Sequence, residues 1–476
     1  MSLFLVILRP RHVLKFALLT GLLVSMSACT SMGFTNVFSD YAEQLKNVRS
    51  AQLNGDFKAA AAMIEIPKPS QTNYALSILE KARLSFLAND WTQSRKEFNL
   101  VSDVLEQEAA KAKLRVSKGL ANVTALVSSD NAITYDIPAY EQTMLHSYQA
   151  LNYLFLGQMD GALVEVRRAN LIQENALKEH QQDIDKGVES FDKEALNQTY
   201  PSMSAMIGDL KNGFQNAYTF YLSGLLYEAA KQPNDAYIDY KRALEIYPAN
   251  HYLQQDVLRL ATHLNMVDDV ALYSAKYGEY KPAVIADSGE LVIIVERGVI
   301  QAKQEVTISL PIFTSGYQAR FFNFALPVYQ GKLNQYPSLS VNINDERYTS
   351  EQIVRLQSLA SKQLQEQVAA LVTRQALRLV AKEQLRRTMS KEGGDIGNIL
   401  ATIYNMASEQ ADTRSWLTLP DEVQIIRIPL AAGKQQVKLV YGSKNETLDL
   451  DIKAKRITLI NLTTIGQFEG LKLTQL

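Results

Sequence analysis

The sequence is poor in the residues that disulfide-bonded scaffolds, cysteine metal clusters and nucleic-acid-binding surfaces require. Cys29 is the only cysteine among 476 residues, so the chain cannot form an internal disulfide or a cysteine cluster for a metal. The formal net charge of −1 provides no general attraction to nucleic acid, and no nucleic-acid partner is expected. With 22 glycines and 13 prolines but 47% hydrophobic residues, the composition favours a folded, largely helical protein. A chain of this length is expected to form two or three domains.

Sequence patterns of catalytic and cofactor sites are missing as well. No phosphate-binding loop and no Gly-x-Ser-x-Gly nucleophile elbow occurs. The glycine-rich segment 393–397 lacks a preceding strand and a following lysine, and we interpret it as a hinge between helices. Four histidines are isolated from one another, without the paired spacing of a zinc site: His146, His180, His251 and His263. The sequence therefore predicts a protein that is not an enzyme and has no cofactor and no metal.

The amino terminus carries an export pattern. Basic residues at Arg9, Arg11 and Lys15 precede the short apolar stretch 16–24, and Met26-Ser27-Ala28-Cys29 follows. The last four residues resemble a bacterial lipoprotein lipobox, which implies a signal peptide over 1–28 and acylation of Cys29, palmitate included. The alternative is an uncleaved anchor helix, but the apolar stretch is shorter than the roughly 20 residues that a spanning helix needs.

The residue after the cysteine bears on the destination of the protein. Thr30 stands where many lipoproteins retained in the inner membrane have aspartate. By resemblance to that sorting rule, we expect an outer-membrane lipoprotein that faces the periplasm. Three acyl chains would hold it there far more firmly than a single chain could.

Residues 29–283 are predicted to form a solenoid of helix pairs similar to tetratricopeptide repeats, which have a 34-residue period. The clearest copy runs from Gln215 to Pro248 and has a small–large pattern of packing residues. In its two helices these are Phe220, Gly224, Tyr227, Ala236, Tyr240 and Ala243. A second copy has its turn at Gly157, weaker copies surround Trp91 and Gly55, and a final pair, 252–265 and 267–277, is expected to cap the array.

Residues 284–476 are predicted to form a small antiparallel β-sandwich, interrupted by helices at about 350–408. A buried run at 291–295 is followed by segments in which apolar and polar residues alternate. These expected strands are 306–310, 339–343, 423–430, 437–441, 448–452 and 457–462. The whole chain is therefore expected to be an α+β protein, with the helical solenoid first and the β domain second.

The expected helical insertion changes character along its length. Its first half has an apolar face that includes Val368 and Val372. Beyond Thr373 basic residues recur at intervals of four and form a basic stripe: Arg374, Arg378, Lys382 and Arg386. This stripe could meet anionic lipid headgroups or an acidic partner, with about 1 kcal/mol per cation near a charged surface. The alternative is a solvated helix face.

Two further features concern tyrosine and the segment 411–420. Most of the 23 tyrosines should be packing residues, but Tyr148 and Tyr237 lie off the repeat consensus and are partner-binding candidates. In 411–420 we expect Trp416 to anchor a core and Asp412 with Arg414 to fix the crossing from helix to strand.

Three stretches, 144–154, 165–170 and 412–420, resemble a family of proteobacterial outer-membrane lipoproteins with tetratricopeptide-like amino-terminal halves. The resemblance spans most of the mature chain, and its motifs carry no known chemistry. It implies a partner-binding role in the envelope and gives no catalytic residues.

Together these features predict a lipid-anchored periplasmic scaffold that binds a protein partner through its repeats, while the β domain offers a second docking surface. Concave surfaces of helical solenoids commonly hold such partners. Two alternatives stay open. One is a module that binds peptidoglycan or another glycan through exposed aromatic residues. The other is an enzyme with an unfamiliar site, which would need a polar pocket of clustered Asp, Glu or His residues.

Overall fold

The computed structural model describes residues 41–118, 133–183, 193–280, 287–314, 318–379, 410–441, 444–466 and 468–476. The chain divides into two compact units, Met1–Leu45 and Lys46–Leu476. In the first unit the structure describes one short helix, α2 (Tyr41–Gln44). The signal peptide and Cys29 lie outside the described residues, so their prediction stays a prediction. Everything below concerns the second unit.

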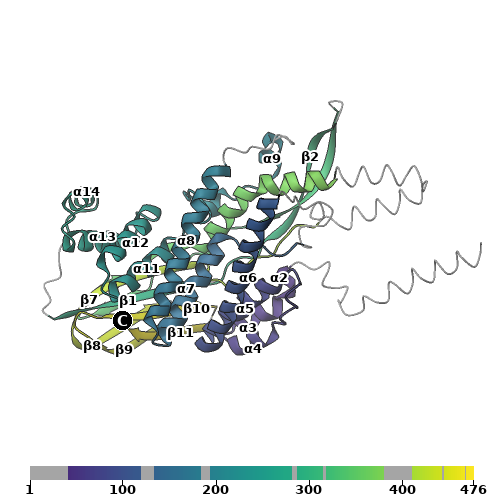
Figure 1. Ribbon diagram of the computed structural model, residues 1–476. Coiled ribbons are helices and arrows are strands. Elements are labelled where there is room, and N and C mark those ends of the chain that lie inside the picture. The colour runs from purple at the N-terminus through teal and green to yellow at the C-terminus, as the bar shows by residue number, and fades with distance from the viewer. Residues whose placement is uncertain are drawn as a thin grey trace, which may run out of the picture. The chain divides into compact units, whose positions relative to one another are not determined.

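Consecutive antiparallel helix pairs make up the first half of this unit (Figure 1). The pairs are α3 (Lys46–Leu53) with α4 (Phe57–Met63), α5 (Tyr74–Leu87) with α6 (Trp91–Lys118), α7 (Ala139–Phe155) with α8 (Met159–Asp183), α11 (Ala217–Ala229) with α12 (Pro233–Ile246), and α13 (His251–His263) with α14 (Val267–Tyr277). Two short helices, α9 (Lys193–Thr199) and α10 (Ser204–Ile207), lie between the third and fourth pairs in the sequence. The predicted helical repeat is confirmed.

Local sequence explains why the pairs form. Gly157 takes a φ of +72° between α7 and α8, a conformation that costs glycine little. Pro233 occupies the first turn of α12, where its missing N–H is no loss. A Cβ atom on Gly224 would lie 2.7 Å from the ring of Tyr240, so α11 and α12 approach closely only because residue 224 has no side chain. This contact is the small–large packing predicted from the repeat pattern.

The strands of the second half form two sheets and a separate hairpin. They are β1 (Ser288–Arg297), β2 (Gln304–Thr314), β3 (Gln318–Val328), β4 (Ser340–Ile343), β5 (Glu346–Thr349), β6 (Glu351–Arg355), β7 (Glu422–Ala431), β8 (Gly433–Tyr441), β9 (Lys444–Ile452), β10 (Ile457–Ile465) and β11 (Phe468–Gln475). The large sheet has the order β11-β10-β1-β7-β6, the small sheet has the order β5-β4-β8-β9, and β2 pairs with β3.

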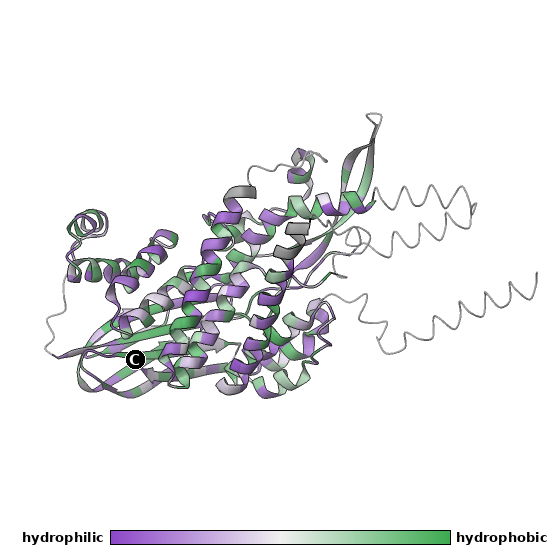
Figure 2. Ribbon diagram, viewed as in Figure 1, coloured by the Kyte–Doolittle hydropathy of each residue, from purple (hydrophilic) through white to green (hydrophobic). Residues whose placement is uncertain are grey.

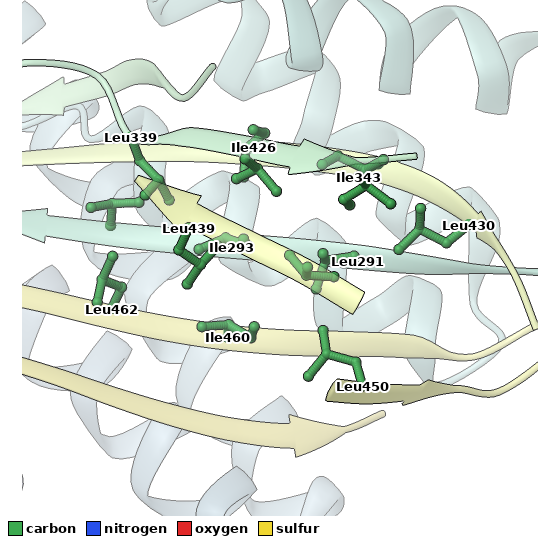
Figure 3. Close-up of a cluster of buried hydrophobic side chains, with 14 of the residues drawn as sticks. Leu291, Ile293, Leu339, Ile343, Ile426, Leu430, Leu439, Leu450, Ile460 and Leu462 are labelled. Carbon is green, nitrogen blue, oxygen red and sulfur yellow. The ribbon is translucent and has the colours of Figure 1, made fainter. Parts of the chain in front are cut away.

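One face of the large sheet packs against the small sheet. Figure 3 shows aliphatic side chains of both sheets directed toward each other, among them Leu291, Ile293 and Ile426 from the large sheet and Ile343 and Leu439 from the small one. The other face of the large sheet packs against the helices (Figure 1). Strand β1 is therefore covered on both sides, and its residues from Leu291 to Val295 are completely buried.

The β domain differs from the predicted antiparallel sandwich. It is not a closed sandwich, because helices cover the outer face of the large sheet and the β2–β3 hairpin belongs to neither sheet. Strands β1 and β10 pair in parallel, for example Ile293 with Ile460. Their sequences could not show this, because strands buried on both faces look alike in either direction.

The helical insertion begins later than predicted, at residue 356 instead of about residue 350. Residues 351–355 form strand β6, the helix covers 356–379, and the remainder of the predicted insertion lies outside the described residues, as does the predicted hinge at 393–397. Val368 and Val372 on this helix pack against Leu310 and Phe324 of the β2–β3 hairpin. The apolar half of the expected helix therefore covers one face of the hairpin.

Candidate functional site

The inner side of the helix pairs is where a repeat protein would be expected to bind a partner. In this chain the large sheet occupies that side. From the second pair onward, the first helix of each pair (α5, α7, α11 and α13) contacts the large sheet through the side chains described below. We call these four the inner helices, and α6, α8, α12 and α14 the outer helices.

A buried ion pair joins the second and third helix pairs to β1. Arg83 of α5 donates a hydrogen bond of 2.7 Å to the carboxylate of Glu296, and both side chains are fully buried. The hydroxyl groups of Tyr148 and Thr463 donate to the same carboxylate at 2.9 and 3.0 Å. The guanidinium of Arg83 also lies 4.2 Å from the centroid of the Tyr148 ring. These contacts fix β1 against α5 and α7.

A second charged cluster joins the last two pairs to β7. Arg427 of β7 lies 3.1 Å from Glu228 of α11 and 3.2 Å from Asp256 of α13. Arg259 of α13 pairs with the same two carboxylates at 2.6 and 2.9 Å. Glu290 of β1 completes the coordination of Arg427 at 3.1 Å. Opposite charges here compensate one another across the seam between helices and sheet.

The segment 411–420, which we call the strap, runs between the inner helices and the sheet. Glu80 of α5 accepts hydrogen bonds from the backbone N–H groups of Leu417 and Thr418, at 2.7 and 2.9 Å. Glu141 of α7 accepts one from the N–H of Trp416 at 3.0 Å. Burial raises the pKa of the Glu80 carboxyl group to about 7. The inner helices thus hold an extended segment of their own chain through its backbone.

The strap behaves as its sequence predicted. Trp416 is completely buried and lies against Phe98 and Tyr148. Arg414 pairs with Asp412 at 2.7 Å and also donates to Asn73, beside the start of α5. The predicted core anchor is confirmed, and Asp412 and Arg414 do form a pair. The helical side of the crossing that this pair was predicted to fix lies outside the described residues, so that role stays a prediction.

Of the two tyrosines predicted to bind a partner, neither has a free ring. Tyr148 is completely buried against Arg83 and Glu296, so the prediction of a partner-binding role is wrong for this residue. Tyr237 is 3% exposed, and its hydroxyl donates to Asp269 of α14 at 2.5 Å. Tyr237 joins α12 to the capping pair instead. A position off the repeat consensus indicated a special contact in both cases, but the contact lies within the chain.

The basic stripe is not a continuous charged surface. Arg374 is exposed, but Arg378, one turn later, is completely buried. Gln375 on the same side of the helix donates to the backbone of Ala325 in β3, so this side faces the hairpin and not solvent. The prediction is therefore wrong for Arg378. Lys382 and Arg386 lie outside the described residues.

The outer helices, in contrast, expose aliphatic side chains. Large hydrophobic residues that are at least about a third exposed occur on every one of them: Leu100 on α6, Val164, Leu171 and Leu177 on α8, Ile238 on α12, and Val267 and Leu272 on α14. The four inner helices, all of whose residues the structure describes, expose none. Figure 2 shows hydrophilic and hydrophobic residues side by side on the outer helices. In the first pair both helices expose such a residue, Leu53 on α3 and Met63 on α4. From the second pair onward, the exposed apolar surface of the array thus lies on its outer side.

A groove of ≈ 370 Å³ lies between α8 and α12, and we call it the outer groove. Each helix contributes residues at positions i, i+3, i+4 and i+7, and Tyr227 of α11 completes the lining: Arg167, Asn170, Leu171 and Glu174 from α8, and Asp235, Ile238, Asp239 and Arg242 from α12. Arg242 pairs with Glu174 at 3.0 Å, and Arg167 donates to the Tyr227 hydroxyl at 3.2 Å. The first contact joins α8 to α12, and the second joins α8 to α11.

The floor of the outer groove is polar. Asp239 is 3% exposed, and one of its carboxylate oxygens, Oδ2, accepts hydrogen bonds from Ser223 at 2.6 Å and Asn170 at 2.8 Å. Burial raises the pKa of the Asp239 carboxyl group. Asn170 is 8% exposed, and its Oδ1 atom is buried without a hydrogen-bond donor. The groove was not predicted from the sequence, although each of its two stripes has the spacing of one helix face.

Metal-ligand clusters, exposed aromatic rings and membrane-spanning helices are rare or missing among the described residues. No group of three or more His, Cys, Asp or Glu side chains in these residues is placed to hold a metal ion. Among the tyrosine, phenylalanine and tryptophan side chains whose burial is described, Phe321 on the hairpin, at 72%, is the exposed one. Within the described ranges no helix combines the length and apolar character needed to cross a membrane.

No protein-family model and no curated protein matches this sequence. Solved structures with a partly similar arrangement include MamA from Desulfovibrio magneticus RS-1, which is 13% identical, with 50% of this chain and 94% of that chain covered and a TM-score of 0.27. Another is BtubC from P. vanneervenii, at 12% identity, 50% and 81% coverage and a TM-score of 0.25. Yeast Tom70 gives 15% identity, 49% and 61% coverage and a TM-score of 0.13. At such TM-scores the likeness carries no conclusion about what this chain binds.

Proposed function

We propose that this protein is a non-catalytic scaffold that binds a protein partner through the outer helices of its array, while a lipid on Cys29 tethers it to the outer membrane on the periplasmic side. The choice of the outer helices as the binding surface rests on one observation: the large sheet and the strap already occupy the inner side of the array. Buried ion pairs and backbone hydrogen bonds attach the large sheet and the strap there, for example at Glu296 and Glu80. A partner would have to break these contacts to enter, whereas the outer helices are open.

The exposed aliphatic residues support this choice of surface. Single exposed aliphatic residues are common on soluble proteins, but here they recur on successive outer helices and not on the inner ones. Protein interfaces typically have an apolar centre within a polar rim, and the outer groove has Leu171 and Ile238 beside charged residues. Glycan binding through exposed aromatic residues receives less support, because Phe321 alone among the described aromatic side chains has that exposure.

Photo-cross-linking in intact cells tests the partner-binding surface. A photoreactive residue is placed at Leu100, Leu171 or Val267 on the outer helices and, as a matched control, at Lys434 on the small sheet, which is also exposed. We expect adducts of one protein to recur from the outer positions and to be missing from the control. If Lys434 gives the adducts and the outer positions give none, the partner-binding surface lies on the β domain and the proposal is wrong.

The anchor is tested separately, because it rests on the lipobox pattern of the sequence. Cells fed radiolabelled palmitate should label the wild-type protein and not the Cys29→Ser variant, and membrane fractionation should place the wild type with the outer membrane. A wild-type protein without label would contradict the anchor but leave the partner-binding surface untouched.

A further inference from the structure

The walls of the outer groove suit an aliphatic chain. Leu171 is 54% exposed and Ile238 is 48% exposed, and each lies near the middle of one of the two helical stripes that line the groove. The Arg242–Glu174 pair and the Arg167–Tyr227 hydrogen bond involve the first or last residues of these stripes. An occupant therefore meets apolar surface at the entrance and polar atoms below.

The floor has one buried acceptor that lacks a donor. Asn170 Oδ1 accepts no hydrogen bond, whereas the amide nitrogen of the same side chain donates to Asp239 and Ser223. Asp239 accepts hydrogen bonds from Asn170 and Ser223 through its Oδ2 atom, and its Oδ1 atom lies 3.7 Å from Arg242. A buried acceptor without a donor costs free energy, which a ligand with several N–H groups would recover.

The charges of the groove point to a cationic ligand. Two arginines, Arg167 and Arg242, face three acidic residues, Glu174, Asp235 and Asp239. Arg242 lies 3.0 Å from Glu174 and 3.7 Å from Asp239. The lining thus has one carboxylate more than it has arginines, and Asp239 is almost fully buried, where an approaching cation is screened little by water.

We propose that the outer groove binds a lysine or arginine side chain of a protein partner, with the aliphatic stem between Leu171 and Ile238 and the cationic head at Asn170 and Asp239. This inference rests on the proposed function, of which it specifies one contact. An ammonium or guanidinium group has enough donors to reach Asn170 Oδ1 and the Asp239 carboxylate at once. An acidic or purely apolar side chain would leave Asn170 Oδ1 without a donor.

The test uses small probes of matched length, observed by methyl NMR of the full-length chain labelled at isoleucine and leucine methyl groups. The probes are n-butylammonium, n-butylguanidinium, n-pentanol and pentanoate. We expect the two cations to shift the methyl signals of Ile238 and Leu171 at concentrations at least about tenfold lower than n-pentanol, a difference that corresponds to about 1.4 kcal/mol. Pentanoate should not shift them.

Two pairs of variants make the result specific. Asp239→Asn should abolish the preference for cations over n-pentanol, whereas Asp268→Asn, which removes an exposed carboxylate of α14, should keep it. Because Asp239 is buried and its replacement could disturb folding, Leu171→Ser serves as a second variant at an exposed position. It should weaken cation binding, and Leu272→Ser on α14 should not.

The outcomes separate this inference from the proposed function. Equal shifts by n-pentanol and the cations, or no shifts by any probe, would overturn the cation site. Adducts from Leu100 and Val267 together with such a negative result would leave the partner-binding role of the outer helices standing, and this groove would be excluded as its cationic contact. Selective shifts that Asp239→Asn removes would establish the site.

Discussion

The attachment of the large sheet to the inner helices predicts a large effect of a small substitution, Glu296→Gln. The carboxylate of Glu296 accepts hydrogen bonds from Arg83, Tyr148 and Thr463 at 2.7, 2.9 and 3.0 Å, and its side chain is completely buried. Glutamine keeps the shape but removes the charge and puts an N–H₂ group where one acceptor was. The charge of Arg83 then stays buried without a counterion.

The magnitude follows from the burial of both partners. Removal of one partner of a buried ion pair costs about 3–5 kcal/mol, a large part of the roughly 5–15 kcal/mol of a typical folding free energy. Replacement of both charges by apolar residues, Arg83→Met with Glu296→Met, should recover at least half of that loss, because no charge is then buried alone. An exposed pair provides the control: Glu108 lies 2.8 Å from Lys111, and Glu108→Gln should change stability by less than about 0.5 kcal/mol.

The assay is urea-induced unfolding of the full-length chain, followed by tryptophan fluorescence and circular dichroism. Trp416 is completely buried beside Tyr148, so its emission reports on the same seam between helices and sheet. A cost below about 1 kcal/mol for Glu296→Gln would show that the ion pair does not hold the sheet in place. A double variant less stable than the single one would refute the argument from charge burial.

Further predictions concern the same seam and the repeat. Burial raises the pKa of the Glu80 carboxyl group to about 7 from 4.5. The contribution of this group to the free energy of unfolding is therefore full below about pH 4.5 and is lost as the pH rises through 7. Glu80→Gln should remove this fall in stability when urea unfolding is measured across that pH range. Burial lowers the pKa of Lys472 to about 7 from 10.5, so its contribution is full above about pH 10.5 and is lost as the pH falls toward 7. Lys472→Met should therefore raise the midpoint of thermal unfolding at pH 7, and an unchanged midpoint would contradict the cost of its burial. Gly224→Ala should lower the midpoint of thermal unfolding and cost about 1–3 kcal/mol, because the Cβ atom of the new alanine would meet the Tyr240 ring. An unchanged midpoint would show that α11 and α12 can move apart.

Several errors in the predicted site share one cause, because a sequence shows that a residue is unusual but not what it contacts. Tyr148 and Tyr237 depart from the repeat consensus, and both make special contacts, but with Glu296 and Asp269 of the same chain. Arg378 has the spacing of a basic stripe and is buried nevertheless. The hairpin covers the helix that carries it.

One signal in the sequence pointed to the occupied inner side and was not used. The first eleven residues of α11, from Ala217 to Tyr227, contain no charged residue, which is typical of a helix covered all round and not of one that lines an open groove. A second unused signal concerned the hairpin: in β3, Phe322, Phe324 and Leu326 alternate with other residues, which predicts the strand that the structure shows there.

The sequence by itself determined the local elements: helix pairs from their 34-residue spacing and, in two of them, from the turn glycines Gly55 and Gly157, and most strands from alternation. It could not determine how the two halves meet, because periodicity reports that a face is buried and not which distant segment buries it. Only the tertiary structure decided that the large sheet and the strap fill the inner side of the array. The reason is physical: Glu296 gains its counterion Arg83, and Arg427 gains two of its three carboxylate partners, Glu228 and Asp256, only when helices from the other half of the chain pack against the sheet.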